Sequence, residues 1–193
     1  MWRLNPLETK ESVRELQVVA DRLHLPFNGI PNYLKHLARS TAAMKAYVEA
    51  EDALGKGQLT PQQRESIALV VAAINGSDYC LAAHTIAGRQ AGLSEDEISA
   101  TQNASAVNPK TETLLRFVQA IVLQRGELGD PDFAAVQKAG YSESEIIEIL
   151  ANVVLNIFTN YFNILVRTNL DNQFLPPQQN NQSTDKYILE KSL

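Results

Sequence analysis

The stretch TPQQRESIALVVAAINGSDYCLAAH, residues 60–84, decides the fold of this chain. Thr60 is a favourable N-cap residue and Pro61 a favourable first helical residue, while Gly76 is a common helix terminator. These signals predict one helix that begins at Pro61 and stops just before Gly76, followed by a second helix. Residues 67–74 are all apolar, so the first helix has almost no polar face. A helix that is apolar on nearly every side is buried, and we therefore expect it at the centre of the molecule.

Helix start and stop signals recur outside this stretch, whereas alternating apolar runs and hairpin turns are nearly absent. Apolar periodicity and capping residues predict further helices over residues 9–24, 33–38, 42–54, 77–92, 109–125, 132–139 and 142–170, and a short one capped by Ser94. The sequence therefore predicts an all-α helical bundle. A weak internal repeat lays residues 60–80 over residues 142–162. The second copy lacks the reactive polar residues of the first, so we expect it to be structural.

The length of 193 residues suits one compact unit. We expect a single domain over residues 1–175 and a polar, turn-rich extension over residues 176–193. The 17 Lys and Arg residues are outnumbered by 22 Asp and Glu residues, which leaves a net charge of −5. An acidic chain has no general attraction to phosphate backbones or anionic lipids, so we expect neither a nucleic acid nor a membrane partner. The N-terminus shows no apolar signal-peptide segment, which favours a cytoplasmic location.

The chain contains one cysteine, Cys80. A single thiol excludes an intrachain disulfide and any metal site built from several thiolates. Cys80 and His84 could form half of a metal site, but His24 and His36 lie in other segments. We therefore expect neither a metal ion nor another cofactor.

Three residue types that can carry chemistry surround the turn at Gly76. Cys80 lies in the first turn of the following helix, where unpaired N–H groups and the helix dipole favour a thiolate. His84 is four residues further on and shares the same helix face, while Glu65 is the carboxylate near the start of the preceding apolar helix. Each also has an ordinary structural role, as a small apolar residue, a core histidine and a first-turn carboxylate. Their combination indicates nucleophilic or acid–base chemistry.

Four polar residues repeat every four positions along the last predicted helix: Glu148, Asn152, Asn156 and Asn160. Buried asparagines often fix helix packing or oligomer register, and we favour this interpretation over pocket lining. Two long apolar helices also present more apolar surface than a small bundle covers easily. We therefore expect a homo-oligomer.

Glu65 is followed by an apolar helix, then by NGSDYCLAAH (residues 75–84) and by GLS (residues 92–94). This order resembles that of the carboxymuconolactone decarboxylase and alkylhydroperoxidase D-like superfamily. The resemblance covers about residues 30–170. It implies an all-helical bundle that assembles into dimers, trimers or hexamers, with sites close to subunit contacts. The peroxidase branch of the superfamily carries a glutamate followed by Cys-x-x-Cys-x-x-x-His, and Ser77 stands where that pattern has its first cysteine.

By this resemblance, the catalytic set of a peroxidase-related thiol oxidoreductase comprises Cys80, His84, Glu65 and Ser77. Cys80 would attack a hydroperoxide and become a sulfenic acid, His84 and Glu65 would relay protons, and Ser77 would cap the helix and donate to the thiolate. Because Ser77 replaces the resolving cysteine, an external thiol would have to act as reductant. Two alternatives stay open: a non-redox, decarboxylase-like enzyme that acts on a small organic acid through Glu65 and His84, and a non-catalytic redox sensor.

Overall fold

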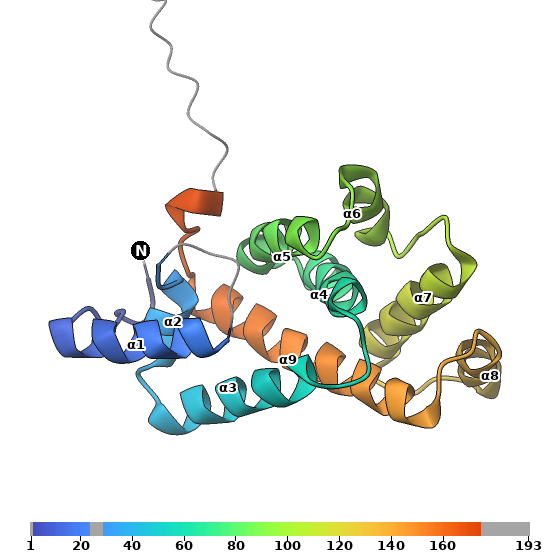
Figure 1. Cartoon of the computed structure of the whole chain (residues 1–193), viewed down its shortest axis with the longest axis horizontal. Helices are drawn as coiled ribbons and strands as arrows, with labels where there is room; N and C mark the ends of the chain where they lie inside the picture. The colour runs from blue at the N-terminus through green and yellow to red at the C-terminus, as the bar shows by residue number, and fades with distance from the viewer. Residues whose placement is uncertain (1, 24–28, 175–193) are drawn as a thin grey trace, which may run out of the picture.

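The computed structural model describes residues 2–23 and 29–174 of the chain. Within these ranges the backbone forms nine α-helices, one 3₁₀ turn and no strand, which confirms the predicted all-α class. Figure 1 shows α1 (Lys10–Arg22), α2 (Asn32–Leu37), α3 (Thr41–Gly55), α4 (Pro61–Asn75), α5 (Asp78–Gln90), α6 (Glu95–Thr101), α7 (Pro109–Gln124), α8 (Asp130–Lys138), α9 (Glu143–Val166) and η1 (Asn172–Phe174). The predicted C-terminal extension and the predicted helix end at His24 lie outside the described residues.

The ends of α4 follow the residues that the sequence singled out. Thr60 Oγ1 accepts the backbone N–H of Gln63 at 3.2 Å, and Gln63 Oε1 accepts the backbone N–H of Thr60 at 2.8 Å. This reciprocal capping box satisfies two N–H groups near the helix end. At the other end Gly76 has a left-handed φ of 66°, which a residue without a Cβ adopts readily, and the chain turns directly into α5.

The central position expected of α4 is what the structure shows. Every residue from Ser66 to Ala72 is buried, and α4 packs against α5, α7 and α9 (Figure 1). One core cluster forms where α4 meets α7, α8 and α9, and Val70, Val118 and Val153 are fully buried in it. A second cluster joins α1, α2 and α3 to α5 and contains Cys80. The cysteine therefore lies in the interior of the protein.

The last helix ends earlier than predicted. α9 stops at Val166 and not at Leu170, because Arg167 takes a left-handed φ of 60°. The N–H of Thr168 then bonds the carbonyl of Asn163 at 3.1 Å, which closes the helix. The other predicted helices agree with the structure to within two residues at each end that lies in the described ranges.

The internal repeat holds only over the first halves of its two copies. Both copies open with a capping box, but α4 breaks at Gly76 whereas α9 continues through the corresponding position. As a result Tyr79 is buried in α5, while its counterpart Tyr161 is 58% exposed on α9. The repeat therefore does not produce a second copy of the turn that carries Cys80.

Among the described residues, α9 is the one helix that is long and apolar enough to cross a membrane by length and composition. A core helix passes the same test, and 44% of the tested window is buried inside the protein. Its buried side chains include the polar residues Asn152, Asn156, Thr159, Asn160 and Asn163. These features are those of a helix that contributes to a protein core.

Candidate active site

A cavity of about 460 Å³ lies between α3, α4, α5 and α9, beside the end of α1. Glu65 of α4 lines it together with Cys80 and His84 of α5. They meet because α4 and α5 pack against each other on the two sides of the turn at Gly76. The structure therefore brings three of the four sequence-predicted site residues into one cavity.

Ser77, the fourth predicted residue, occupies the N-cap position of α5 but does not cap the helix. Its side chain accepts no hydrogen bond from α5, and its hydroxyl has no hydrogen-bond partner among the described residues. Ser77 has a ψ of 90°, whereas the capping residues Thr60 and Ser142 have ψ values of 158° and 161°. Ser77 is buried and does not line the cavity. The predictions that it caps the helix and donates to the sulfur of Cys80 are therefore wrong.

His84 and Glu65 form a hydrogen-bonded pair. Nδ1 of His84 lies 2.9 Å from Oε2 of Glu65, and each side chain is about a quarter exposed. A carboxylate at this distance favours the tautomer with its proton on Nδ1, so Nε2 is the nitrogen that can take up a further proton. Burial alone would lower the pKa of His84, but the hydrogen bond and charge of Glu65, aided by the charge of Glu51, raise it above the ordinary value.

A residue of α9 contacts the sulfur of Cys80. Nδ2 of Asn163 donates a hydrogen bond to Sγ of Cys80 at 3.2 Å, and both residues are buried. Oδ1 of the same amide has no partner among the described residues, so the sulfur contact is the hydrogen bond that orients this side chain. The structure thus places a hydrogen-bond donor at the candidate nucleophile.

Hydroxyl and carboxyl groups from α2 and α3 form another wall of the cavity. Oη of Tyr33 lies 3.0 Å from Oη of Tyr47, and Glu51 is one turn further along α3 on the same helix face as Tyr47. Burial, reinforced by the negative charge of Glu65, raises the pKa of Glu51 despite the opposing effect of His84. This wall therefore holds a second carboxyl group in addition to Glu65.

Tyr79 of α5 also lines the cavity, and a hydrogen bond to Asp171 holds its side chain in place. Its hydroxyl donates a short hydrogen bond to Asp171, which also accepts the backbone N–H of Asn32 at 3.1 Å. The rings of Tyr79 and Tyr33 meet edge to face, with centroids 6.0 Å apart. Asp171 thus ties the segment after α9 to both α2 and α5, which keeps the two tyrosines in place.

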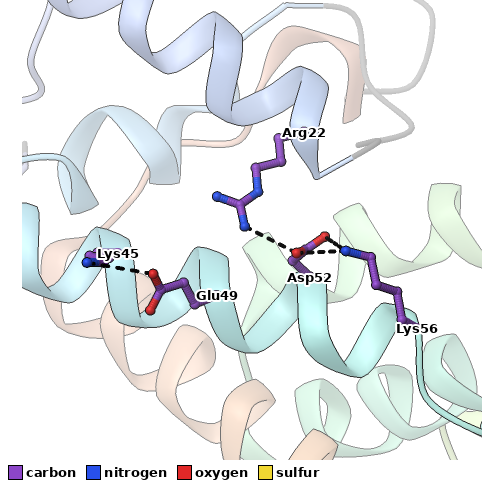
Figure 2. A network of polar contacts seen from close by, with 5 residues as sticks. All are labelled: Arg22, Lys45, Glu49, Asp52 and Lys56. Atoms are coloured by element: carbon purple, nitrogen blue, oxygen red, sulfur yellow. Dashed lines mark hydrogen bonds and ion pairs between the residues drawn. The ribbon is translucent and has the colours of Figure 1, made fainter.

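Ion pairs join α1 to α3 at the rim of the cavity (Figure 2). Asp52 accepts from Arg22 at 3.1 Å and from Lys56 at 2.9 Å. The hydrogen bonds from Lys56 and Arg22 lower the pKa of Asp52 below its ordinary value. Both cations at this rim are therefore already paired with a carboxylate. Pairs this exposed contribute little to stability, so we assign them a role in shaping the entrance.

Residues 2–23 and 29–174 contain no group of three or more His, Cys, Asp or Glu side chains that could hold a metal ion. His36 is buried in the core, where it packs edge to face on Trp2 with ring centroids 5.6 Å apart. His24 lies outside the described residues. The side chains that line the cavity include the thiol of Cys80, the imidazole of His84, the carboxyl groups of Glu51 and Glu65, and the hydroxyls of Tyr33 and Tyr47.

The polar stripe of α9 has more than one role. Asn160 accepts a hydrogen bond from Asn75 of α4 at 3.1 Å, as expected for packing between helices. Asn152 and Asn156 instead donate to carbonyls one turn earlier in α9. Oε2 of Glu148 accepts the N–H groups of residues 58 and 59 at 2.7 and 3.3 Å, ahead of α4. The stripe therefore does contribute to packing, but only part of it bonds between helices.

Sequence analysis did not select Asn163, Glu51, Tyr33 or Tyr47. A signal for Asn163 did exist, because Asn156, Thr159 and Asn163 are spaced by three and four positions, which is one helix face. Thr159 and Asn163 both line the cavity, whereas none of the four residues of the polar stripe does. The residues of α2 and α3 carried no comparable signal.

Part of the chain matches a known protein family. Residues 40–122, which include Glu65, Cys80 and His84, match the model of the carboxymuconolactone decarboxylase family. Comparison with curated protein sequences gives no significant match.

Solved structures share the fold at low identity. The debrominase Bmp8 without ligand has a TM-score of 0.78 and 16% identity, over 89% of this chain and 94% of that chain. The same protein as a cysteine-to-alanine variant in complex with 2,3,4-tribromopyrrole gives the same score and identity. A peroxidase-related protein from Silicibacter sp. TM1040 has a TM-score of 0.75 and 22% identity, over 88% and 89% of the two chains. An alkylhydroperoxidase AhpD core protein from Ralstonia eutropha JMP134 has a TM-score of 0.75 and 21% identity, over 88% and 93%.

Proposed function

We propose that this chain is a member of the carboxymuconolactone decarboxylase and alkylhydroperoxidase D-like superfamily and a single-cysteine peroxidase that reduces an organic hydroperoxide. The observation that carries the proposal is the meeting of Cys80 with the hydrogen-bonded pair of Glu65 and His84 in one cavity. A nucleophile beside an oriented acid–base pair is what covalent catalysis requires. A cavity of about 460 Å³ also leaves room for the organic group of the peroxide.

The roles of the residues follow from their atoms. Nε2 of His84 removes the thiol proton, while Glu65 holds the imidazole through Nδ1 and stabilises the imidazolium. The thiolate, which accepts from Asn163, attacks one peroxide oxygen. The S–O bond forms as the O–O bond breaks, so Cys80 becomes a sulfenic acid and the other oxygen leaves as an alcohol after protonation. The sulfur is oxidised by two electrons and the peroxide is reduced by two.

The reductant in this proposal is an external thiol. The chain has no second cysteine that could condense with the sulfenic acid. One external thiol would form a mixed disulfide with Cys80 and release water, and a second would cleave that disulfide and restore the thiol. Small thiols stay reduced in the cytosol, and this chemistry fits the cytoplasmic location that we expect.

The direct test is to oxidise the purified protein with cumene hydroperoxide and follow Cys80. We expect loss of one free thiol per chain and a sulfenic acid that a trapping reagent labels, with turnover when a thiol is supplied. Cys80→Ser should consume no peroxide. His84→Ala should slow the oxidation of Cys80 by about 10²-fold or more, because positioned acid–base groups contribute that much. Peroxide consumption that persists in Cys80→Ser would overturn the proposal, and oxidation without turnover would support a redox sensor instead.

A second candidate is the non-redox, decarboxylase-like enzyme. The observation that favours it is that the pair of Glu65 and His84 is complete without Cys80. Such an enzyme would act on a small organic acid and keep its activity after alkylation of the thiol. Retained activity on a lactone acid after complete alkylation would therefore favour this candidate over the peroxidase.

We also propose that two copies of the chain associate through one face of α9. This α9 face consists of exposed apolar side chains spaced by three or four positions: Ile147, Leu150, Val154, Phe158, Tyr161 and Leu165. Residues 149–166 carry no charged side chain, so acidic chains would meet there without like-charge repulsion. An exposed apolar stripe of this length is typical of an interaction surface.

A further inference from the structure

Two tyrosines and a glutamate lie together in the wall of the cavity, and the proposed reaction does not use them. Glu51 is one turn from Tyr47 on the same face of α3, and Oη of Tyr47 lies 3.0 Å from Oη of Tyr33 on α2. Both tyrosines are buried, and all three residues line the cavity together with Cys80. Buried hydroxyl groups cost free energy unless they are hydrogen-bonded, so the contact between the two tyrosines stabilises this arrangement.

We propose that Glu51, Tyr47 and Tyr33 form a proton relay that protonates the leaving oxygen of the hydroperoxide, separately from His84, which takes up the thiol proton. This inference rests on the proposed function of Cys80. It assigns the second proton transfer of that reaction to the opposite wall of the cavity.

The protonation of Glu51 sets the direction of the relay. Either hydroxyl of the tyrosine pair can be the donor. When Glu51 is ionised, Tyr47 donates to it and Tyr33 donates to Tyr47. When Glu51 is protonated, it can donate to Tyr47 and Tyr47 to Tyr33, so the O–H of Tyr33 is available to the cavity. The protonated state of Glu51 is therefore the one that can deliver a proton to a bound substrate.

The surroundings of Glu51 shift its pKa upward, in the direction of this protonated state. The groups that act on it are Tyr47 on α3, Glu65 and Arg64 on α4, and His84 on α5. Burial and the charge of Glu65 together outweigh the opposing groups, so the pKa of Glu51 lies above its ordinary value. Glu65, at 2.9 Å from His84, is the carboxyl group that pairs with the imidazole.

The other end of the relay shares the cavity with the sulfur. Tyr33 and Cys80 belong to the same buried core cluster, and both line the cavity. Tyr33 also packs edge to face on Tyr79, the residue next to Cys80 in α5. A peroxide bound at the sulfur therefore lies in the cavity that Tyr33 lines.

The reduction of the hydroperoxide by Cys80 balances in protons and electrons. The thiolate forms the S–O bond, the O–O bond breaks and the electron pair leaves on the alkoxide oxygen. Tyr33 gives its proton to that oxygen, Tyr47 replaces it, and Glu51 replaces the proton of Tyr47. Water at the cavity mouth then reprotonates Glu51 and receives the proton that His84 took from Cys80. The sum is one thiol plus one hydroperoxide to one sulfenic acid plus one alcohol.

The test uses leaving groups that do or do not need a proton. An alkoxide from cumene hydroperoxide needs protonation as it leaves, whereas the carboxylate from a peroxy acid does not, nor does iodide from iodoacetamide. The rate of Cys80 modification by each reagent is measured in a single turnover, so no reductant is needed. The variants are Glu51→Gln and Tyr47→Phe, and the matched control is Glu49→Gln, whose carboxylate pairs with Lys45 on the outer side of α3 (Figure 2).

We expect Glu51→Gln and Tyr47→Phe to slow oxidation by cumene hydroperoxide by about 10²-fold, and to change the rates with the peroxy acid and iodoacetamide far less. The wild-type rate with cumene hydroperoxide should fall as the pH rises through the raised pKa of Glu51, and Glu51→Gln should lose this decline. Equal slowing with all three reagents, or no slowing, would overturn the relay alone. Failure of wild-type Cys80 to react with any peroxide would instead overturn the proposed function.

Discussion

The amide of Asn163 on α9 donates to the sulfur of Cys80 on α5 at 3.2 Å, across 83 positions of the sequence. The longest helix of the protein thus supplies a donor to the nucleophile on another helix. The same helix contributes Val153 to the main core cluster, so the position of the donor is fixed by core packing. α9 therefore supplies both core side chains and the hydrogen-bond donor to the thiol.

Replacing Asn163 by Leu should slow alkylation of Cys80 by iodoacetamide at pH 7 about 10-fold. Leu has a similar volume but no donor, and a hydrogen bond to a charged group is worth about 1.5 kcal/mol. The control is Thr159→Val, since Thr159 lines the same cavity and its hydroxyl bonds only carbonyls of its own helix. Equal alkylation rates in the wild type and the Asn163 variant would show that the amide does not stabilise the thiolate.

Replacing Glu65 by Gln should lower the free energy of unfolding by about 1 to 2 kcal/mol at pH 6 and by less at pH 9. The pKa of His84 is raised in the folded protein. The stabilisation that its charged imidazole contributes is therefore fully present below pH 6.5 and is lost as the pH rises through the folded-state pKa. Urea denaturation of both proteins at the two pH values measures the difference. The same loss at pH 6 and pH 9 would exclude a contribution from the charged imidazole.

Replacing Ser77 by Cys should leave the free energy of unfolding within about 0.5 kcal/mol of the wild type. The Ser77 hydroxyl makes no cap and has no partner in the described structure, so its loss removes no hydrogen bond. The new thiol lies one turn before Cys80, and such thiols lie close enough to bridge. We expect peroxide to produce an internal disulfide, which mass analysis under non-reducing conditions detects. A sulfenic acid that persists beside a free thiol would contradict this geometry.

Replacing Val154 by Glu should dissociate the assembly that we propose. Val154 is 56% exposed at the middle of the α9 face, so a charge there disfavours contact between copies while leaving the core intact. Light scattering should give a multiple of 21.3 kDa for the wild type and about the monomer mass for the variant. Leu123→Glu, at an exposed apolar residue of α7, is the control and should leave the mass unchanged. A monomeric wild type would overturn the proposal.

The local features of this protein could be predicted from its sequence because they depend on neighbours in the chain. Thr60 and Ser142 cap helices through residues three positions away, and Gly76 ends α4 through its own backbone angle. The spacing of Cys80 and His84 places them on one helix face for the same reason. Sequence periodicity also identified α4 as the central helix, since a helix without a polar face has to be buried.

The groups that surround the sulfur were decided only by the tertiary structure. Periodicity predicts which residues share a helix face, but not which faces meet, so the contact of Asn163 with Cys80 could not be read from spacing. The same holds for Glu51 and its tyrosine partners, which come from α2 and α3. Ser77 is the opposite case: the residue type predicts a cap, but the tight turn from α4 into α5 buries its hydroxyl without a hydrogen bond to the helix.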